Sequence, residues 1–252
     1  MNRVITIANQ KGGVGKTTTV INLGASLAAA EKRTLIVDFD PQSNSTSGLG
    51  HREKRKGRSV YRVLGGSLPL EEAILGTDLP FLFLLPSEPD LAGAEIEMVG
   101  MDGREALLRD LIGPLRESYD FILVDTPPSL GLLTLNGLVA CDSVLVPLQC
   151  EYYALEGVSE LMATLDRVRE TLNSAIAVEG VLLTMYDDRT NLSRQVTDEV
   201  RKFFGDKVYR TVIPRNVRLG EAPSHGKPAI LYDIRSKGAE AYMQLAQEVL
   251  EK

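Results

Sequence analysis

A glycine-rich loop between a predicted strand and a predicted helix constrains the fold of this chain most. The apolar run at residues 4–8 precedes the loop Lys11-Gly12-Gly13-Val14-Gly15-Lys16-Thr17-Thr18, and a helical pattern follows it. Glycines let the backbone approach an anion and turn its N–H groups inward, and the following helix adds the positive end of its dipole. This order of strand, loop and helix predicts a phosphate-binding site in an α/β protein.

Two side chains of the loop carry the chemistry that nucleotide phosphates need. The Lys16 ammonium would contact the β- and γ-phosphates, and the Thr17 hydroxyl would ligate Mg²⁺. The standard pattern is G-x-x-x-x-G-K-[ST], but Gln10 stands at its first glycine, and a further lysine, Lys11, precedes the glycines. The alternative is a plain glycine turn, and the flanking pattern together with two further motifs downstream argues against it.

Apolar runs alternate with helical patterns along the chain. Strands are predicted at residues 4–8, 34–38, 81–85, 121–125, 143–147, 178–184 and 208–213, and helices at 17–30, 104–117, 155–172, 192–204 and 237–250. Continuously apolar strands are typical of a parallel sheet buried on both faces. We therefore predict a twisted, mostly parallel sheet with helices on both faces, in a single domain of residues 1–252. The irregular stretch 42–57 is predicted to be a mobile surface loop.

Composition excludes several classes of protein. The hydrophobic fraction of 44% and the charged fraction of 25% are ordinary for a soluble globular protein. No apolar run approaches the roughly 20 residues of a membrane span, and the N-terminus lacks a signal-peptide pattern. The first predicted strand begins within three residues of the N-terminus, so we expect no separate DNA-reading module before it.

The two cysteines predict neither a metal cluster nor an extracellular protein. Cys141 and Cys150 stand in no C-x-x-C or Cys/His pattern. Two unpaired thiols in a reducing cytoplasm are expected, and a bridge between two subunits stays open as an alternative.

Two acidic motifs end predicted strands. In Asp38-Phe39-Asp40-Pro41-Gln42, Asp38 and Asp40 are expected to point the same way because side chains alternate along a strand. A carboxylate there can orient an attacking water or support the shell of Mg²⁺, whereas the alternative is a pair of turn-forming aspartates before a proline. In Phe121-Ile122-Leu123-Val124-Asp125-Thr126-Pro127-Pro128, the apolar run delivers Asp125 to the strand end, where it can hold Mg²⁺ through water. The three motifs all fall at strand C-termini, so one site can collect them.

Positive charge is unevenly spread over an acidic chain of net charge −6. Residues 189–237 contain eleven Lys or Arg and five Asp or Glu, and a second basic cluster comprises Arg52, Lys54, Arg55, Lys56 and Arg58. Local basic faces are compatible with a polyanion-binding patch, although such runs are often only solvated loops. Whether the 52–58 cluster contacts DNA stays open.

The three motifs together resemble the deviant Walker ATPases of the ParA/MinD superfamily. The similarity continues through Gln149-Cys150-Glu151-Tyr152-Tyr153-Ala154-Leu155-Glu156-Gly157 and through Val212-Ile213-Pro214-Arg215-Asn216-Val217-Arg218-Leu219-Gly220-Glu221-Ala222-Pro223-Ser224. These two segments resemble the chromosomal ParA (Soj) branch in particular. The resemblance covers essentially the whole chain.

The resemblance implies a Mg²⁺-dependent ATPase that forms a nucleotide sandwich dimer. Lys11 would be the signature lysine that reaches the partner's phosphates, and Gly12 would lie at a packed seam where a side chain obstructs closure. The phosphate and Mg²⁺ residues would be Lys16, Thr17 and Thr18, with Gly13, Val14 and Gly15 in the cradle, Asp40 positioning water beside the metal and Asp125 as the Walker B residue. The segment Pro214-Arg215-Asn216 would line the adenine, and no Asn-Lys-x-Asp guanine motif occurs.

The same resemblance implies that the ATP dimer binds double-stranded DNA without sequence preference. Arg189 and Arg218 match the DNA-contacting arginines, and both lie in the basic segment. The expected partner is a ParB-type centromere-binding protein whose basic N-terminal segment stimulates hydrolysis. We expect a slow cytoplasmic, nucleoid-associated ATPase that acts as a switch in chromosome or plasmid partitioning.

Three alternative functions differ in what they require of the sequence. A MinD-like membrane ATPase needs a basic amphipathic C-terminal helix, whereas residues 241–252 carry no cationic stripe and are predicted to form a docked final helix. A cluster-carrying protein resembling the nitrogenase iron protein needs cysteines in a suitable arrangement. A nucleotide switch that regulates a replication initiator is compatible with partitioning, and the sequence does not separate the two.

Overall fold

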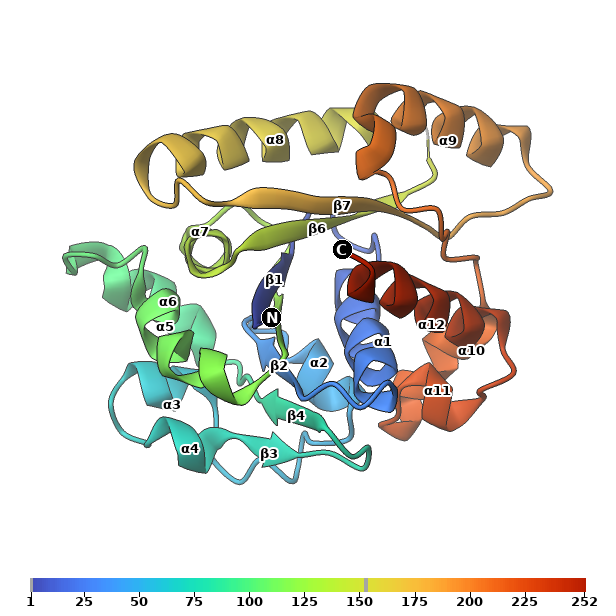
Figure 1. Cartoon of the computed structure of the whole chain (residues 1–252). Coiled ribbons are helices and arrows are strands. Elements are labelled where there is room, and N and C mark those ends of the chain that lie inside the picture. The colour runs from blue at the N-terminus through green and yellow to red at the C-terminus, as the bar shows by residue number, and fades with distance from the viewer. Residues whose placement is uncertain (1, 152–153) are drawn as a thin grey trace.

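A seven-stranded sheet runs through the molecule in the order β3-β4-β2-β5-β1-β6-β7 (Figure 1). The computed structural model describes residues 2–151 and 154–252. The strands are β1 (Arg3–Ile7), β2 (Thr34–Asp38), β3 (Leu75–Gly76), β4 (Leu82–Leu85), β5 (Phe121–Asp125), β6 (Ser143–Gln149) and β7 (Ala177–Thr184). The short edge strand β3 is antiparallel to β4, and the other pairs are parallel. The predicted mostly parallel sheet is confirmed.

Helices cover both faces of this sheet, as predicted. One face carries α1 (Lys16–Ala29), α10 (Val217–Glu221), α11 (Ala229–Tyr232) and α12 (Lys237–Leu250). The other carries α3 (Val60–Leu64), α4 (Leu70–Ala73), α5 (Leu91–Glu97), α6 (Leu107–Ile112), α7 (Leu132–Ala140), α8 (Ala154–Thr171) and α9 (Asn191–Phe204). The short helix α2 (Asn44–Gly48) follows β2.

Strand alternation divides the core between the two faces. In β2, Ile36 packs with α1 and α12, whereas its neighbours Leu35 and Val37 pack with the helices of the opposite face. All three side chains are fully buried. Burial on both faces explains why these strands read as continuous apolar runs rather than as alternating ones.

The final helix is docked against α1, as predicted from the absence of a cationic stripe. Tyr242, Leu245 and Val249 of α12 are buried, and the Tyr242 hydroxyl lies 3.1 Å from the Thr19 hydroxyl. The Ser236 hydroxyl caps the start of α12 by accepting a hydrogen bond from the Ala239 amide. Within the described residues, none of the helices combines the length and the apolar character that crossing a bilayer requires.

The prediction of a strand at residues 208–213 is wrong. The segment runs beside β7, but it forms only isolated bridges, from Val208 to Val181 and from Pro214 to Tyr186. The Glu248 carboxylate of α12 accepts hydrogen bonds from the Arg210 and Thr211 amides, at 2.9 and 2.7 Å. Because a side chain takes these two amides, a continuous ladder does not form.

The prediction of a mobile surface loop at residues 42–57 is also wrong for its first half. Residues 44–48 form α2, and Ser45 and Thr46 are buried because their hydroxyls bond to the strand-end carboxylates. Polar residues therefore mark an internal hydrogen-bond network here rather than solvent exposure.

The helix predicted at residues 104–117 is shorter than expected. Regular α6 ends at Ile112, and a 3₁₀ segment continues over Gly113–Ser118. Pro114 explains the change, because proline lacks the N–H of the helical ladder and its ring clashes with the preceding turn.

Candidate functional site

The glycine loop between β1 and α1 has the backbone conformation of an anion cradle. Gly13 and Gly15 have φ values of +75° and +94°, a region in which a side chain would be strained. The Thr184 hydroxyl donates to the Val14 carbonyl at 2.8 Å and ties the loop to the end of β7. The helix α1 begins directly after Gly15, at Lys16. The loop amides and the positive helix end thus face the same space.

Lys16 lies between the loop and the acidic strand ends. Its side chain is buried, and its Nζ donates to the Lys11 carbonyl at 3.2 Å. Burial lowers the pKa of Lys16, while the charges of Asp125 and Asp40 oppose that change. The ammonium is therefore partly desolvated and close to carboxylates, which suits a group that exchanges its present contact for phosphate oxygens.

Two carboxylates stand side by side where β2 and β5 end. Asp38 and Asp125 are partners in the β2–β5 register, and both are fully buried. Asp38 Oδ2 accepts hydrogen bonds from the Thr46 amide at 2.7 Å and from its hydroxyl at 2.6 Å, and Asp125 Oδ2 accepts one from Ser45 at 2.7 Å. Burial raises the pKa of both carboxyls, and the Asp125 charge raises that of Asp38 further.

One oxygen at this site lacks a hydrogen-bond partner in the described part of the chain. Asp125 Oδ1 is buried, and it accepts no hydrogen bond from any described residue. The Thr17 hydroxyl is near enough to lower the pKa of Asp125. Carboxylate and hydroxyl oxygens are the ligands that Mg²⁺ prefers, so the residues present fit that ion.

The protein alone does not supply a complete cage. Within the described ranges, no three His, Cys, Asp or Glu side chains form a group that could hold a metal ion. An ion beside Thr17 and Asp125 would therefore need phosphate and water oxygens as further ligands, as is usual for Mg²⁺ at nucleotide sites.

Asp40 lies on the phosphate side of the site, whereas the Asp38 carboxylate is fully buried and bonded to Thr46, so the prediction that both side chains reach the phosphate end is not met by Asp38. Asp40 lines a cavity of about 260 Å³ together with Gly12, Lys16 and Thr17. Its Oδ1 accepts a hydrogen bond from the Gln42 amide at 2.9 Å. Burial raises the pKa of Asp40, while the Gln42 amide and the Lys16 charge lower it.

The segment predicted to line the adenine borders a second, more apolar cavity of about 240 Å³. Pro214, Arg215 and Asn216 belong to its wall. Gly15, Thr18 and Met185 line both this cavity and the one that contains Asp40, so the two adjoin. The cavity with Asp40 is lined by the glycine loop and charged side chains and suits the phosphates of a nucleoside triphosphate, and the more apolar cavity suits its base.

The structure turns the Lys11 side chain away from its own phosphate cradle. Its Nζ lies 3.2 Å from Glu151 Oε2, and the Gln149 side-chain Nε2 donates to Glu151 Oε1. The Tyr152 and Tyr153 positions of the same motif lie outside the described residues. A Cβ on Gly12 would meet Pro128 at 3.8 Å, an ordinary contact, so the single chain places no steric demand on Gly12. The expected roles of both residues in a dimer stay predictions.

The two arginines predicted to contact DNA lie on the surface just beyond the second cavity. Arg189 follows Met185 by four residues, in the turn before α9, and Arg218 follows Asn216 in α10. Their side chains are 82% and 49% exposed, so both are accessible to a large ligand. Each is also held by carboxylates of this chain.

The second basic cluster is only partly available. Arg55 donates to the Ser87 carbonyl and lies 3.9 Å from Glu88, and Lys54 lies 3.9 Å from Asp78. Arg52, Lys56 and Arg58 are exposed. Both cysteines are buried free thiols, as expected, and burial raises the pKa of each.

Sequence reasoning missed several residues that complete the site. Thr184, Met185, Leu219 and Tyr242 line the second cavity, and Ser45 and Thr46 hold the carboxylates. The left-handed φ of Met185, +51°, marks a strained turn where β7 leaves the sheet, and nothing in the residue type signals it.

Comparison with known proteins gives a consistent result over the full length. A family model described as an AAA domain matches residues 2–178. The chromosome partitioning protein ParA of Myxococcus xanthus is 55% identical over 252 residues, which cover 100% of this chain and 89% of that protein. The sporulation initiation inhibitor protein Soj of Bacillus subtilis is 56% identical over 249 residues, or 99% of this chain and 98% of that protein. The chromosome-partitioning ATPase Soj of Thermus thermophilus is 54% identical, with 98% and 95% covered.

Solved structures share the fold across different activities. The cobyrinic acid a,c-diamide synthase of Mycobacterium smegmatis with bound ADP and magnesium has a TM-score of 0.87 and 40% identity, covering 100% of this chain and 95% of that one. The cell division ATPase MinD of Pyrococcus furiosus has a TM-score of 0.81 and 26% identity, covering 100% and 99%. The fold alone therefore does not separate these functions, and the sequence relatives carry more weight.

Proposed function

The chain belongs to the ParA/Soj family of chromosome-partitioning ATPases, and on this premise we propose that it is an ATP-driven dimerisation switch that binds DNA. ATP is its substrate and Mg²⁺ its cofactor. The observation that carries the nucleotide assignment is the buried oxygen of Asp125, which has no partner among the described residues and lies beside Thr17 and the glycine cradle. A buried polar atom left in this state is completed by a ligand.

Each side chain of the site has a separate task in hydrolysis. Lys16 and the loop amides hold the phosphates, with Thr18 at the same helix start, and Thr17 and Asp125 hold the metal. Mg²⁺ held there would neutralise charge on the phosphate oxygens. Asp40 orients a water for in-line attack on the γ-phosphorus, so that a new P–O bond forms as the bond to the ADP oxygen breaks.

Dimerisation would complete this site with a cation from the second subunit. Lys11 lies at the mouth of the site and is bound to Glu151 rather than to its own cradle. In a homodimer that encloses two nucleotides, Lys11 would reach the partner's phosphates and stabilise the charge that develops there. Hydrolysis would then depend on assembly, and loss of the γ-phosphate would release the dimer.

DNA binding would follow from the same assembly. Arg189 and Arg218 flank the outer wall of the nucleotide groove, so two subunits would double the number of cations available to one duplex. Contacts with phosphates alone carry no sequence information, and their strength falls steeply with salt. The active protein would therefore be found in the cytoplasm on the nucleoid.

A ParB-type centromere-binding protein is the proposed stimulating partner. Turnover would be slow until its basic N-terminal segment rigidifies the closed dimer. The MinD-like alternative is disfavoured, because the apolar face of α12 is already buried against α1.

The decisive experiment measures binding to a random-sequence DNA duplex with ATP, with ADP and without nucleotide, across a salt series. Asp40→Ala is used to hold the ATP state, since it should bind ATP without hydrolysing it. Salt-sensitive binding that requires ATP, and that is lost in Arg189→Glu and Arg218→Glu, supports the proposal. Absence of binding in every nucleotide state overturns the DNA step and leaves the ATPase assignment standing.

A further inference from the structure

Both arginines assigned to DNA are already neutralised within the chain. Arg189 and Asp187 form a two-pronged pair, in which Nε donates to Oδ1 at 2.9 Å and Nη2 to Oδ2 at 2.7 Å. The Arg189 amide also donates to Asp187 Oδ1 at 3.1 Å. These hydrogen bonds lower the pKa of Asp187 to about 2, so this carboxylate stays charged at neutral pH.

Arg218 is held by two carboxylates from different elements. Its Nη1 donates to Glu221 Oε2 at 2.7 Å within α10, and its Nε lies 3.3 Å from Asp233 Oδ2, just after α11. The Tyr232 hydroxyl donates to the same Glu221 oxygen at 3.3 Å. These contacts of Arg218 with Glu221 and Asp233 join α10 to the end of α11, and they orient the guanidinium.

We propose that Asp187, and Glu221 together with Asp233, compete with DNA phosphates for Arg189 and Arg218. This inference rests on the proposed DNA-binding function and adds the residues that set its strength. A carboxylate presents two oxygens to a guanidinium in the same fork geometry that a phosphate offers. Each arginine can therefore exchange one anionic partner for another without changing its own shape.

The exposure of these pairs makes the exchange reversible. The Arg189 side chain is 82% exposed, and those of Arg218 and Glu221 are 49% and 40% exposed. Exposed ion pairs are weak and are screened by salt. The duplex can displace the carboxylates, but each displaced carboxylate then stands near a phosphate and repels it. A single subunit would consequently bind DNA weakly, and useful affinity would need the arginines of two subunits.

The test compares DNA affinity in two neutralised variants, each built on Asp40→Ala with ATP present. Asp187→Asn releases Arg189, and Glu221→Gln with Asp233→Asn releases Arg218. The amides keep the size of the acids, and the side-chain oxygen that remains in Asp187→Asn can still accept the hydrogen bond from the Arg189 amide. We expect each variant to bind a random duplex about three to ten times more tightly at low salt, since each exposed pair recurs in both subunits. The gain should shrink as salt rises, because the removed repulsion is screened.

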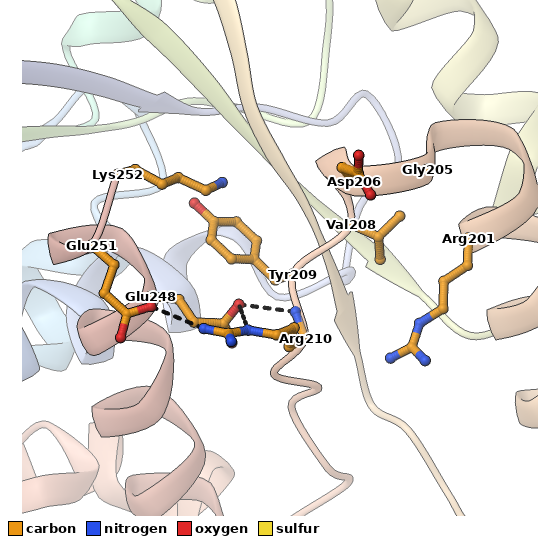
Figure 2. Close-up of a pocket in the computed structure, with 9 residues that line it drawn as sticks. All are labelled: Arg201, Gly205, Asp206, Val208, Tyr209, Arg210, Glu248, Glu251 and Lys252. Atoms are coloured by element: carbon orange, nitrogen blue, oxygen red, sulfur yellow. Dashed lines mark hydrogen bonds and ion pairs between the residues drawn. The ribbon is translucent and has the colours of Figure 1, made fainter.

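A control matched to Asp187→Asn removes one negative charge elsewhere. Arg210 is 78% exposed and is paired with Glu251 at 2.9 Å, beside a cavity of about 790 Å³ at the far ends of α9 and α12 (Figure 2). Arg218 lies near the opposite end of α12, because its neighbour Leu219 packs against Gly238 at the start of that helix. The 14 residues of α12, roughly 20 Å, therefore separate the control site at Glu251 from Arg218. Glu251→Gln should leave the affinity for DNA nearly unchanged.

Four results would overturn the inference. Weaker or unchanged binding in Asp187→Asn and in Glu221→Gln with Asp233→Asn would mean that the carboxylates orient the arginines or play no part, while the proposed DNA function would stand. An equal gain in Glu251→Gln would mean that only net charge matters. If the unsubstituted protein binds no duplex with ATP, the proposed function itself fails, and this inference fails with it. Adding Arg189→Gln to Asp187→Asn should abolish the gain, and a gain that survives contradicts direct competition.

Discussion

Buried carboxylates occupy both ends of the central sheet, and their surroundings are opposite. At the C-terminal end, Asp38 and Asp125 stand side by side, and burial raises the pKa of both. At the N-terminal end, Glu179 of β7 accepts hydrogen bonds from the hydroxyls of Ser143 at 2.6 Å and Tyr209 at 3.3 Å. It also forms an ion pair with Arg3 at 2.6 Å. Burial alone would raise the pKa of Glu179, but the contacts with Arg3 and Ser143 and the charge of Lys252 lower it.

The difference separates a completed structural site from an incomplete one. Folding supplies every partner of Glu179, so its charge stabilises the native state. In the part of the chain that the structure describes, folding leaves one oxygen of Asp125 without a partner, so at neutral pH the acidic cluster opposes folding until cations and phosphates arrive. Removing the charge of Glu179 should therefore lower stability and spare the nucleotide site, whereas removing that of Asp125 should raise stability and impair nucleotide chemistry.

The largest effect is expected for Lys16→Ala, which removes the buried cation of the cradle. ATP affinity should fall roughly 100-fold or more, because losing one partner of a buried ionic contact costs about 3 kcal/mol. Titration calorimetry with Mg-ATP measures it, and Lys207→Ala, at an exposed lysine, serves as the control. Retained ATP affinity in a folded Lys16→Ala protein would contradict the assignment of the cradle.

Asp125→Asn should separate catalysis from stability. We expect Mg²⁺-dependent hydrolysis to fall about 100-fold, in line with the loss of one preorganised electrostatic contact. The nucleotide-free protein should melt a few degrees higher, about 2–4 °C for each kcal/mol gained, because the buried charge beside Asp38 is gone. Asparagine can still accept the Ser45 hydrogen bond. A lower melting temperature of the nucleotide-free variant would show that the charge of Asp125, like that of Glu179, stabilises the folded protein.

The nucleotide site was largely predictable from sequence because its chemistry is local. The cradle, Lys16, Thr17 and Asp125 stand in short motifs whose strand and helix flanks set their geometry. Residues 208–213 were mispredicted because the competitor for their amides, Glu248, lies far away in the sequence. Ser45 and Thr46 looked like loop residues for the same reason, since their partners are the aspartates of other elements.

Glu179→Gln should destabilise the protein and spare the nucleotide site. We expect a loss of about 2 kcal/mol at neutral pH, with ATP affinity unchanged, because a buried hydrogen-bonded charge is removed from the end opposite the cradle. The folded-state pKa of Glu179 lies below the unfolded value of about 4.3, so its contribution is present above that value and is lost as pH falls through the folded pKa. Urea unfolding at neutral pH and near pH 4 should show the difference shrinking.

The control for that measurement is Glu199→Gln, at an exposed glutamate of α9, which should change stability little at either pH. A pH-independent loss in Glu179→Gln would mean that the substitution disturbs packing rather than removing a charge. Weakened ATP binding would mean that the two ends of the sheet are coupled.

The smallest effect is expected at Glu151, a carboxylate at the nucleotide end that is only half-buried. Its pair with Lys11 has side chains 47% and 39% exposed, so its strength is that of an exposed contact, under about 1 kcal/mol. Glu151→Gln should free Lys11 for the partner's phosphates and tighten ATP-dependent dimerisation about twofold to fivefold. Sedimentation velocity with the Asp40→Ala background measures the dimer fraction, and Glu160→Gln, at an exposed position of α8, is the control. A weaker dimer in Glu151→Gln would show that Glu151 supports the assembled state. In that case the C-terminal end of the sheet, like the N-terminal end, contains a carboxylate whose task is structural.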